Sequence, residues 1–399
     1  MKKYLPVLGS LALSALSVTP SAWGSAIEAP HGAARDADLA GNTVAAPDDG
    51  ASTLLINPAG VVSRARDEAL VAVLAFSFNA SYENEATGYD GKSARTPVAL
   101  DLWYGLGEYA GWSFGVGAYG ALGAAFDLPA DPDNGQTSPF TGELAILNTG
   151  LVAGRQLSPN LRFGIQLSPA YGKQRVRSPT PLGTMDFKAD GMGLSGIVGL
   201  IYTPMPALSL GLAYRTTGFV DMKGEGSVGG VEQDVETHFV TPQNVTGGFA
   251  YQYSKQLRLL GQLRWIRYED FERGDLEFDE TTALDQPVMA HTKNRIRWGV
   301  GVEYELVPNS MIRAGYTEGK AMIEDDALMP IMFDLDNKMV MLGYEIDYGK
   351  FMVGFTTGYM HLKTRRVSEE ENMMAPGRYT SDSDVSAGLR VTWKLDRPR

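Results

Sequence analysis

The sequence predicts an all-β fold, a 14-stranded antiparallel transmembrane β-barrel whose lumen is plugged by an N-terminal segment. Three observations lead to this prediction. From about residue 69 onwards, apolar and polar residues alternate with the period of two that strands show. Very short turns alternate with long polar loops, and an apolar N-terminal run marks the chain for secretion. Together these features are typical of a barrel in an outer membrane.

Residues 1–24 have the features of a secretory signal peptide. Lys2 and Lys3 precede an apolar run over 5–18, which is too short to span a membrane, and small residues follow. We expect cleavage after Gly24, with Ala26 as the alternative. Loss of the two lysines takes the net charge from −12 to −14, and so acidic a chain is poorly suited to bind nucleic acid.

A segment of small residues, 31–60, separates the signal from the first strand. Asp48, Asp49 and Ser52 offer side-chain oxygens that can cap a short helix. Pro58 ends that helix, because its ring disfavours helical geometry in the residue before it. A barrel of fourteen strands is wider than wall side chains alone can fill. We therefore expect this segment to plug the barrel.

The turns determine the number of strands. Six very short turns alternate with seven longer polar stretches, and this alternation requires fourteen strands. We expect the strands to begin near residues 69, 96, 112, 143, 161, 188, 208, 242, 257, 292, 311, 337, 351 and 384. The long loops are expected at 83–95, 127–142, 173–187, 217–241, 269–292, 317–336 and 365–384.

Aromatic residues support a membrane barrel over a soluble sheet protein. They cluster near the expected strand ends, as in the girdles of membrane barrels; examples are Tyr109, Trp112, Tyr202 and Trp393. A soluble sandwich or propeller would also alternate, but it would not need its long loops on one side. The chain has no cysteine, which excludes disulfides and thiolate metal sites.

Several stretches carry a family resemblance. They are 47–52, Asn57 to Gly60, 241–259, 295–316 and 376–393. On these stretches the chain resembles the FadL-like family of outer-membrane transporters for long-chain fatty acids and other hydrophobic compounds. The resemblance implies a signal peptide at 1–24, an N-terminal hatch at 25–66 and a 14-stranded barrel at 67–399. Hatch positions that match the family are Asp48, Asp49, Ser52, Asn57, Pro58 and Gly60.

The resemblance also implies a function and a location. We expect passive uptake of a hydrophobic small molecule, such as a long-chain fatty acid or an aromatic hydrocarbon, across the outer membrane of a Gram-negative bacterium. The ligand would leave through the hatch region or through a lateral opening in the wall. The alternative is a structural or surface-interaction barrel, similar to a receptor or an adhesin, without a transported ligand.

Candidate ligand residues are apolar side chains at unusual positions. Met339 and Met341 lie in the polar register of their strand, where bulky apolar residues are unexpected, and methionine adapts to varied ligand shapes. They are candidates for a lumen pocket or for contact with the hatch. Met329, Met332 and Phe333 form an apolar patch in a long loop. They are candidates for a first capture site or for packing between loops.

Basic residues in the inward register are the polar candidates. Five of them could hold a ligand carboxylate through paired N–H donors: Arg258, Arg264, Arg295, Arg297 and Arg390. The alternative is that most of these arginines pair with carboxylates and so fix the hatch to the wall; the carboxylates are Glu303, Glu305, Glu345, Asp347 and hatch aspartates such as Asp36 and Asp38.

The remaining motifs predict no catalysis and no cofactor. The four histidines show no metal-ligand spacing, and no serine has a recognisable His/acid arrangement. Acidic clusters at Asp131, Asp133 and 369–371 could bind divalent cations along with surface lipopolysaccharide, or could simply be solvated. We expect a monomer surrounded by outer-membrane lipid and lipopolysaccharide.

Overall fold

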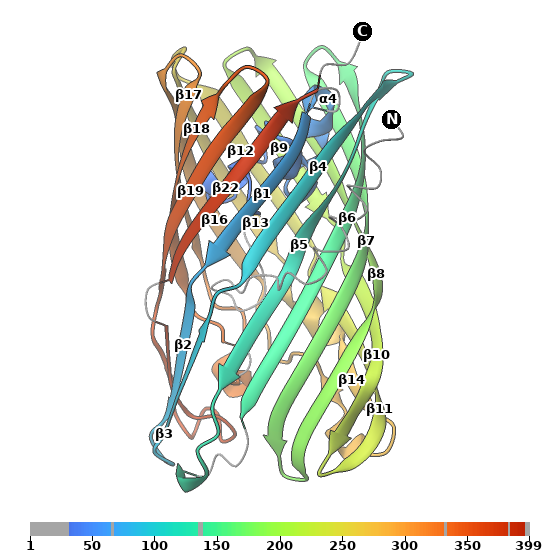
Figure 1. The fold of residues 1–399 in the computed structure, drawn as a ribbon, viewed down its shortest axis with the longest axis vertical. Coiled ribbons are helices and arrows are strands. Elements are labelled where there is room, and N and C mark those ends of the chain that lie inside the picture. The colour runs from blue at the N-terminus through green and yellow to red at the C-terminus, as the bar shows by residue number, and fades with distance from the viewer. Residues whose placement is uncertain (1–31, 65–67, 135–138, 331–332, 382–383, 396–399) are drawn as a thin grey trace.

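The computed structural model describes residues 32–64, 68–134, 139–330, 333–381 and 384–395. The expected signal peptide, its cleavage site, residues 25–31 of the expected hatch and the hatch–barrel boundary at 66 lie outside these residues. The described chain forms one closed antiparallel barrel, because β1 (Glu68–Phe76) pairs both with β4 (Val98–Tyr109) and with β22 (Asp384–Lys394). Figure 1 shows the strands tilted across the barrel axis.

The wall has fourteen strand positions, as the sequence predicts, and each expected start lies within five residues of an observed one. Besides β1, β4 and β22 these are β5 (Trp112–Leu128), β6 (Phe140–Ser158), β7 (Leu161–Thr180), β8 (Gly183–Met205), β9 (Leu208–Arg215), β12 (Asn244–Gln252), β13 (Leu257–Ile266), β16 (Arg295–Val307), β17 (Ser310–Gly319), β18 (Asn337–Asp347) and β19 (Phe351–Leu362).

Additional strands extend the wall at the end that carries the long connections. They are β2 (Phe78–Asn84), β3 (Tyr89–Arg95), β10 (Gly218–Val228), β11 (Val231–Thr241), β14 (Asp275–Phe278), β15 (Gln286–Pro287), β20 (Arg365–Val367) and β21 (Gly377–Thr380). Short 3₁₀ helices lie among them: η2 (Pro132–Asn134), η3 (Tyr268–Arg273), η4 (Thr282–Leu284) and η5 (Asp325–Ala327).

The prediction of loops at 173–187 and 217–241 was wrong. Both stretches form β-hairpins. β7 and β8 stay paired as far as the Thr180–Gly183 pair, and β10 pairs with β11 along its whole length. Their outward side chains are charged because this part of the wall stands beyond the apolar belt described below. A strand that faces water outside and a packed lumen inside alternates like any other strand, but its composition resembles that of a loop.

The outer face carries an apolar belt. On β8 the outward side chains Tyr202, Val198, Leu194 and Met192 are 37 to 66% exposed, and the next outward residue, Asp190, is charged. The stretch from Tyr202 to Met192 is about 25 Å tall for a strand tilted by about 40°, the height of the band on membrane barrels. No helix in the described ranges is long and apolar enough to cross a membrane.

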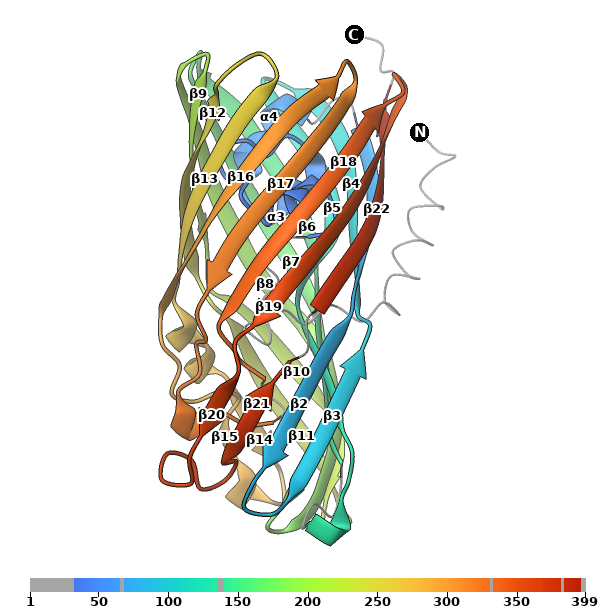
Figure 2. The same ribbon diagram turned by 90° about the vertical axis from the view of Figure 1, so that its left-hand side faces the viewer.

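The N-terminal segment lies inside the barrel near the short turns, which are at the top of Figures 1 and 2. It contains α2 (Arg35–Asp38), α3 (Gly50–Leu55), η1 (Pro58–Gly60) and α4 (Val61–Arg64). Asp49 caps α3 by accepting from the amide of Ser52 at 2.6 Å, and Asn57 caps η1 by accepting from the amide of Ala59 at 3.1 Å. We call residues 32–64 the hatch.

Inward-facing glycines let the hatch backbone touch the wall. A Cβ atom at Gly164 would lie 2.3 Å from the carbonyl carbon of Pro58, and one at Gly315 would lie 2.1 Å from that of Leu39. Such distances are far below van der Waals contact, so only glycine fits. Other glycines that a Cβ would drive into the hatch are Gly150, Gly199, Gly211, Gly299 and Gly343. The wall therefore forms a glycine-lined socket for the hatch.

Candidate functional site

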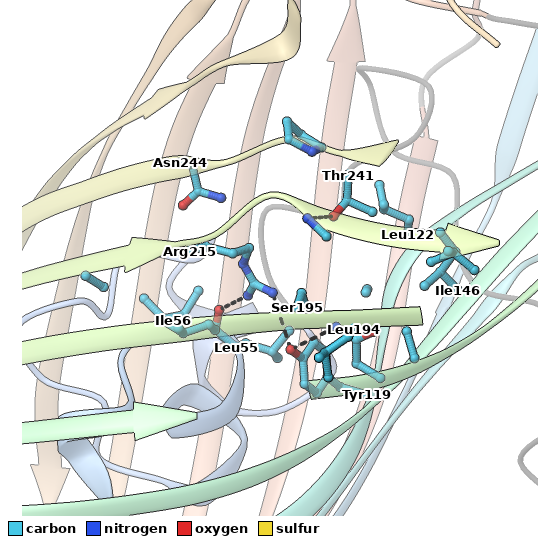
Figure 3. A pocket seen from close by; sticks show the side chains of 18 of the residues that line it. Leu55, Ile56, Tyr119, Leu122, Ile146, Leu194, Ser195, Arg215, Thr241 and Asn244 are labelled. Atoms are coloured by element: carbon cyan, nitrogen blue, oxygen red, sulfur yellow. Dashed lines mark hydrogen bonds between the residues drawn. The ribbon is translucent and has the colours of Figure 1, made fainter. Parts of the chain in front are cut away.

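An inner pocket with a volume of about 60 Å³ lies against the hatch (Figure 3). Leu55 and Ile56 of the hatch border it on one side. The apolar part of its lining comes from the surrounding strands and includes Leu122, Ile146, Ile197 and Val220. Alternation places these side chains inward on β5, β6, β8 and β10, since every second residue of a strand points to the lumen.

The polar part of the inner pocket is positively charged. Arg215 donates from Nη2 to the carbonyl of Leu55 at 2.7 Å and from Nη1 to the hydroxyl of Tyr119 at 3.3 Å. Asn148 and Gln166 also donate to that hydroxyl, at 3.2 and 3.1 Å. Arg264 lines the pocket as well, and no aspartate or glutamate is among its described lining residues. This is the environment that stabilises an anion beside apolar walls.

A larger outer cavity of about 370 Å³ lies towards the loop end of the lumen. Its lining is rich in methionine and aromatic residues and includes Met185, Phe187, Phe239, Leu276, Met289 and Met329. The two cavities are neighbours, because Leu144 lines the outer one and Ile146, the next inward residue of β6, lines the inner one. Successive inward positions of a strand are about 7 Å apart.

The structure separates the three loop residues that the sequence groups together. Met329 lines the outer cavity. Phe333 is buried in an aromatic cluster, with its ring centroid 6.5 Å from that of Phe78, 6.4 Å from Phe126 and 5.7 Å from Tyr379. Met332 lies outside the described residues. Phe333 thus packs against side chains of β2, β5 and β21, whereas the alternative offered by the sequence was packing between loops.

The same loop is held by a buried carboxylate. Asp334 accepts from the amides of Met322 at 2.6 Å and Ile323 at 2.7 Å. Burial raises the pKa of Asp334 to about 6, although these hydrogen bonds and nearby Arg365 oppose the shift. The bonds close the connection between β17 and β18, which carries Met329 over the outer cavity.

Met339 and Met341 are buried in the wall region of β18 and do not line either cavity. They border a space of about 10 Å³ with Phe76, Phe78 and Met360. That volume is too small for a ligand and is comparable with the smallest space that holds one water.

The two predicted arginines have different surroundings. Arg264 and Arg297 face each other across β13 and β16, and both are more than 90% buried. Arg264 lines the inner pocket, whereas Arg297 donates to Oδ1 of Asn337 at 3.1 Å and does not line it. Sequence reasoning missed Arg215 and Tyr119, although inward register along β9 and β5 is the signal that would have found them.

The hatch is fixed to the wall by a network of buried ion pairs. On one side Asp38 lies 2.7 Å from Arg390 and 3.3 Å from Arg313. On the other, Glu303 lies 2.6 Å from Arg35 and 2.7 Å from Arg313. Asp48, Arg258 and Glu345 complete it. Four arginines face four carboxylates, so the network is neutral as a whole.

The other predicted hatch residues fasten the second half of the segment. Asn57 donates to the carbonyl of Val44 at 2.7 Å and to that of Leu200 on β8 at 3.1 Å. Pro58 lies against Gly164, and a Cβ atom at Gly60 would lie 2.8 Å from the carbonyl oxygen of Pro47. All of these contacts join hatch to hatch or hatch to wall.

The predicted acidic clusters show no metal geometry. Within the described ranges, no three His, Asp or Glu side chains come together in a way that could hold a metal ion. Glu371 accepts from the amide and hydroxyl of Ser368 at 2.9 and 2.8 Å.

Comparison with known proteins places this barrel in a family. Residues 15–392 match the family model described as outer membrane protein transport protein (OMPP1/FadL/TodX). No curated protein sequence matches the chain.

Solved structures of similar shape include a Pseudomonas aeruginosa FadL homologue, with a TM-score of 0.76, 15% identity, and 91% of this chain and 98% of that chain covered. The Pseudomonas putida toluene transporter TodX has a TM-score of 0.74 and 15% sequence identity, with 93% of this chain and 100% of that chain covered. The Ralstonia pickettii toluene transporter TbuX has a TM-score of 0.68 and 14% sequence identity, with 95% of this chain and 100% of that chain covered. At these identities the likeness shows the fold alone. By its family match, the chain belongs to the OMPP1/FadL/TodX family of outer membrane transport proteins.

Proposed function

We propose that the protein mediates passive uptake of hydrophobic small molecules, and that its preferred ligands are amphiphiles with an anionic headgroup, of the long-chain fatty acid class. The observation that carries this proposal is the inner pocket. Arg215 and Arg264 line it without an aspartate or glutamate among its described residues, although the chain has a net charge of −12. A carboxylate next to apolar walls satisfies both parts of this lining.

The two cavities suit successive steps of uptake. The outer cavity is large and methionine-rich, so it can adapt to varied apolar shapes and serve as the first binding place. The inner pocket, at about 60 Å³, has room for a headgroup but not for a long tail. A ligand with its carboxylate at Arg215 would keep its tail in the outer cavity, because the two spaces are neighbours.

For the exit, the contacts favour the wall over the hatch. Leu194 and Phe219 face each other on β8 and β10, are 51% and 46% exposed on the outer face, and still line the inner pocket. Close by, two short breaks interrupt the strands of the wall. One lies at 216–217, between the end of β9 and the start of β10. The other lies at 242–243, between β11 and β12, where Pro242 has no amide hydrogen to donate. The hatch, in contrast, is fixed by ion pairs and by its socket.

The domain boundaries stay part of the proposal: a signal peptide at 1–24, a hatch at 25–66 and a barrel at 67–399. In this arrangement the hatch closes the end of the lumen, and the ligand moves sideways above it. No energy source is required, because passive uptake follows the concentration gradient of the ligand.

Uptake of labelled oleate and toluene by cells that lack the gene, complemented with variants, tests the proposal. We expect Arg264→Met to lower oleate uptake about tenfold, the effect of losing one charge-assisted hydrogen bond, and to leave toluene uptake unchanged. Arg297→Met is the matched control, since Arg297 lies opposite Arg264 but outside the pocket.

Each other outcome points to a different function. If deleting the gene changes uptake of neither compound, the protein is an interaction barrel rather than a transporter. If toluene uptake depends on the gene and oleate uptake does not, the ligands are aromatic hydrocarbons, the class named for TodX and TbuX.

A further inference from the structure

Neighbouring strands of the wall are interrupted side by side. The breaks lie between β9 and β10, between β11 and β12, and between β13 and β14, at 216–217, 242–243 and 267–274. The register puts them next to one another. Asn244, just after the second break, pairs with Arg215 and with Ile266, which directly precede the first and the third. The wall therefore has a line of weakness that crosses adjacent strands.

The first two breaks border the inner pocket. Arg215 and Gly218 flank the first, Thr241 and Asn244 flank the second, and all of them line the pocket (Figure 3). Phe219, next to the first break, lines the pocket and is also exposed on the outer face. A wall that opens along these breaks would therefore connect the pocket with the surrounding lipid.

The carboxylate of Asp270 joins the three breaks. Asp270 is buried and lies in η3, which spans the third break. Its Oδ2 accepts from the backbone amide of Gln243 at 3.0 Å and from the hydroxyl of Thr217 at 3.4 Å. Hydrogen bonds to an ionised acceptor are stronger than neutral ones. Asp270 thus supplies the acceptor that a paired strand supplies elsewhere in the wall.

The other oxygen of Asp270 has a second set of partners close by. Oδ1 is buried and accepts no hydrogen bond from the part of the chain that the structure describes. It lies 3.8 Å from Nε of Arg267 and 3.7 Å from Nη1 of Arg273, and both arginines are about half exposed. Charge-assisted hydrogen bonds are about 2.8 Å long, so a small rotation would form them. The buried, unsatisfied oxygen favours that rotation.

Arg273 connects Asp270 to the outer face of the wall. Its guanidinium lies over the ring of Phe219, 5.3 Å from the centroid, which is the geometry of a cation–π contact. Phe219 faces Leu194 across the β8–β10 ladder. If Arg273 turns from the ring to the carboxylate, it releases Phe219 and at the same time draws Asp270 away from Gln243.

We propose that Asp270 is the latch of the lateral exit. Its carboxylate holds Gln243 and Thr217 while the wall is closed, and it turns to Arg267 and Arg273 when the wall opens. This role rests on the proposed exit beside the inner pocket. Asp270 is a positioning residue, since it is not among the described lining residues of either cavity. It determines how often the path is open.

Hydrogen exchange of the purified full-length protein in lipid nanodiscs tests the latch. We expect Asp270→Ala to speed exchange at 216–219 and 241–244 about tenfold, the effect of losing one charge-assisted hydrogen bond. Asp270→Asn keeps an oxygen that accepts from the Gln243 amide but lacks the charge that attracts the arginines, so its exchange should be no faster than wild type. Glu269→Gln is the matched control, because it removes a neighbouring charge of η3 that lies 3.8 Å from Arg267, and it should exchange like wild type.

Uptake distinguishes a latch from a contact that only stabilises the fold. Asp270→Ala should raise the initial rate of oleate uptake by cells severalfold, because the path opens more often. Entry of a large polar antibiotic should not change, because the hatch still closes the lumen. The gain should disappear when Leu194→Cys and Phe219→Cys are added and oxidised, and it should return on reduction. Thr217→Val, which removes only the hydroxyl contact, should give a smaller gain.

Several results would overturn the latch. They are wild-type exchange in Asp270→Ala, equally fast exchange in Asp270→Asn, and faster exchange without a gain in oleate uptake. If deleting the gene changes uptake of neither oleate nor toluene, the proposed function fails, while the exchange comparison still decides whether Asp270 holds the breaks together. If Asp270→Ala does not fold, Thr217→Val gives the same comparison at the first break.

Discussion

Arg390 on the last strand holds Asp38 of the hatch, with Nη1 donating to Oδ1 at 2.9 Å and Nη2 lying 2.7 Å from Oδ2. Both side chains are buried. The two residues are 352 positions apart in the chain, so this contact joins the N-terminal segment to the end of the barrel. The hatch and the final closure of the wall therefore stabilise each other.

We expect Asp38→Ala to loosen the hatch. The substitution leaves Arg390 and Arg313 buried without this carboxylate, and breaking a buried pair costs about 3 to 5 kcal/mol. Hydrogen exchange of the hatch amides should accelerate, and cells should admit more of a large polar antibiotic. Asp127→Ala is the control, because its pair with Arg95 is roughly half exposed and such pairs contribute about 0 to 1 kcal/mol. Unchanged hatch exchange in Asp38→Ala would contradict the fixing role.

A glycine substitution tests the socket directly. Gly315→Ala places a Cβ atom 2.1 Å from the backbone of Leu39, so the hatch or β17 must move. We expect a loss of about 2 kcal/mol or more in stability, in the range of overpacked cores, and a faster release of the hatch to protease. Gly247→Ala on β12 meets nothing closer than 4.0 Å and should behave like wild type. Equal protease resistance of both variants would show that the close approach is not needed.

The strand order could be predicted because its signals are local. Alternation and short turns lie within a few residues, which is why strand starts such as 112, 161 and 208 agree with the structure. The hatch followed from barrel width and from the resemblance around Asn57. The inner pocket could not be derived in the same way, because Arg215 meets the carbonyl of Leu55 across 160 positions. The position of Phe333 could not be predicted either, because it depends on the path that a long loop takes over the aromatic cluster.

The connection over the outer cavity should respond to pH through Asp334. Its pKa is raised to about 6 in the folded protein from 3.8, so the folded state binds this proton more tightly than the unfolded chain does. The group therefore destabilises the docked loop at pH 7, by about 3 kcal/mol. That penalty disappears as pH falls from about 6 to about 4.

Hydrogen exchange of residues 320–330 and 333–336, measured relative to unstructured peptides at each pH, reads out this effect. We expect stronger protection at pH 4.5 than at pH 7 in the wild type. Asp334→Asn keeps an oxygen that can accept from the amide of Met322 but cannot ionise, so its protection should change little over that range. A wild-type loop whose protection rises with pH would refute the assignment.

Reversible disulfides can separate exit through the wall from exit through the hatch, because the chain contains no cysteine. Leu194 and Phe219 are directly opposed in an antiparallel ladder, a geometry with Cβ atoms close enough to bridge. Their double substitution by cysteine ties the wall beside the inner pocket. Leu54→Cys with Gly150→Cys ties the hatch to β6 instead, since Leu54 Cδ2 lies 2.6 Å from the Cβ position of Gly150.

If the ligand leaves through the wall, oxidation should lower oleate uptake severalfold in the wall pair only, and reduction should restore it. Each reduced protein serves as its own control for the substitutions, and mass spectrometry confirms that the bridge has formed. Loss of uptake in the oxidised hatch pair alone would instead require the hatch to move. The reason to expect the first result is physical: moving the hatch breaks the buried ion pairs of Asp38 and Glu303, whereas the wall beside Phe219 already lacks part of its ladder.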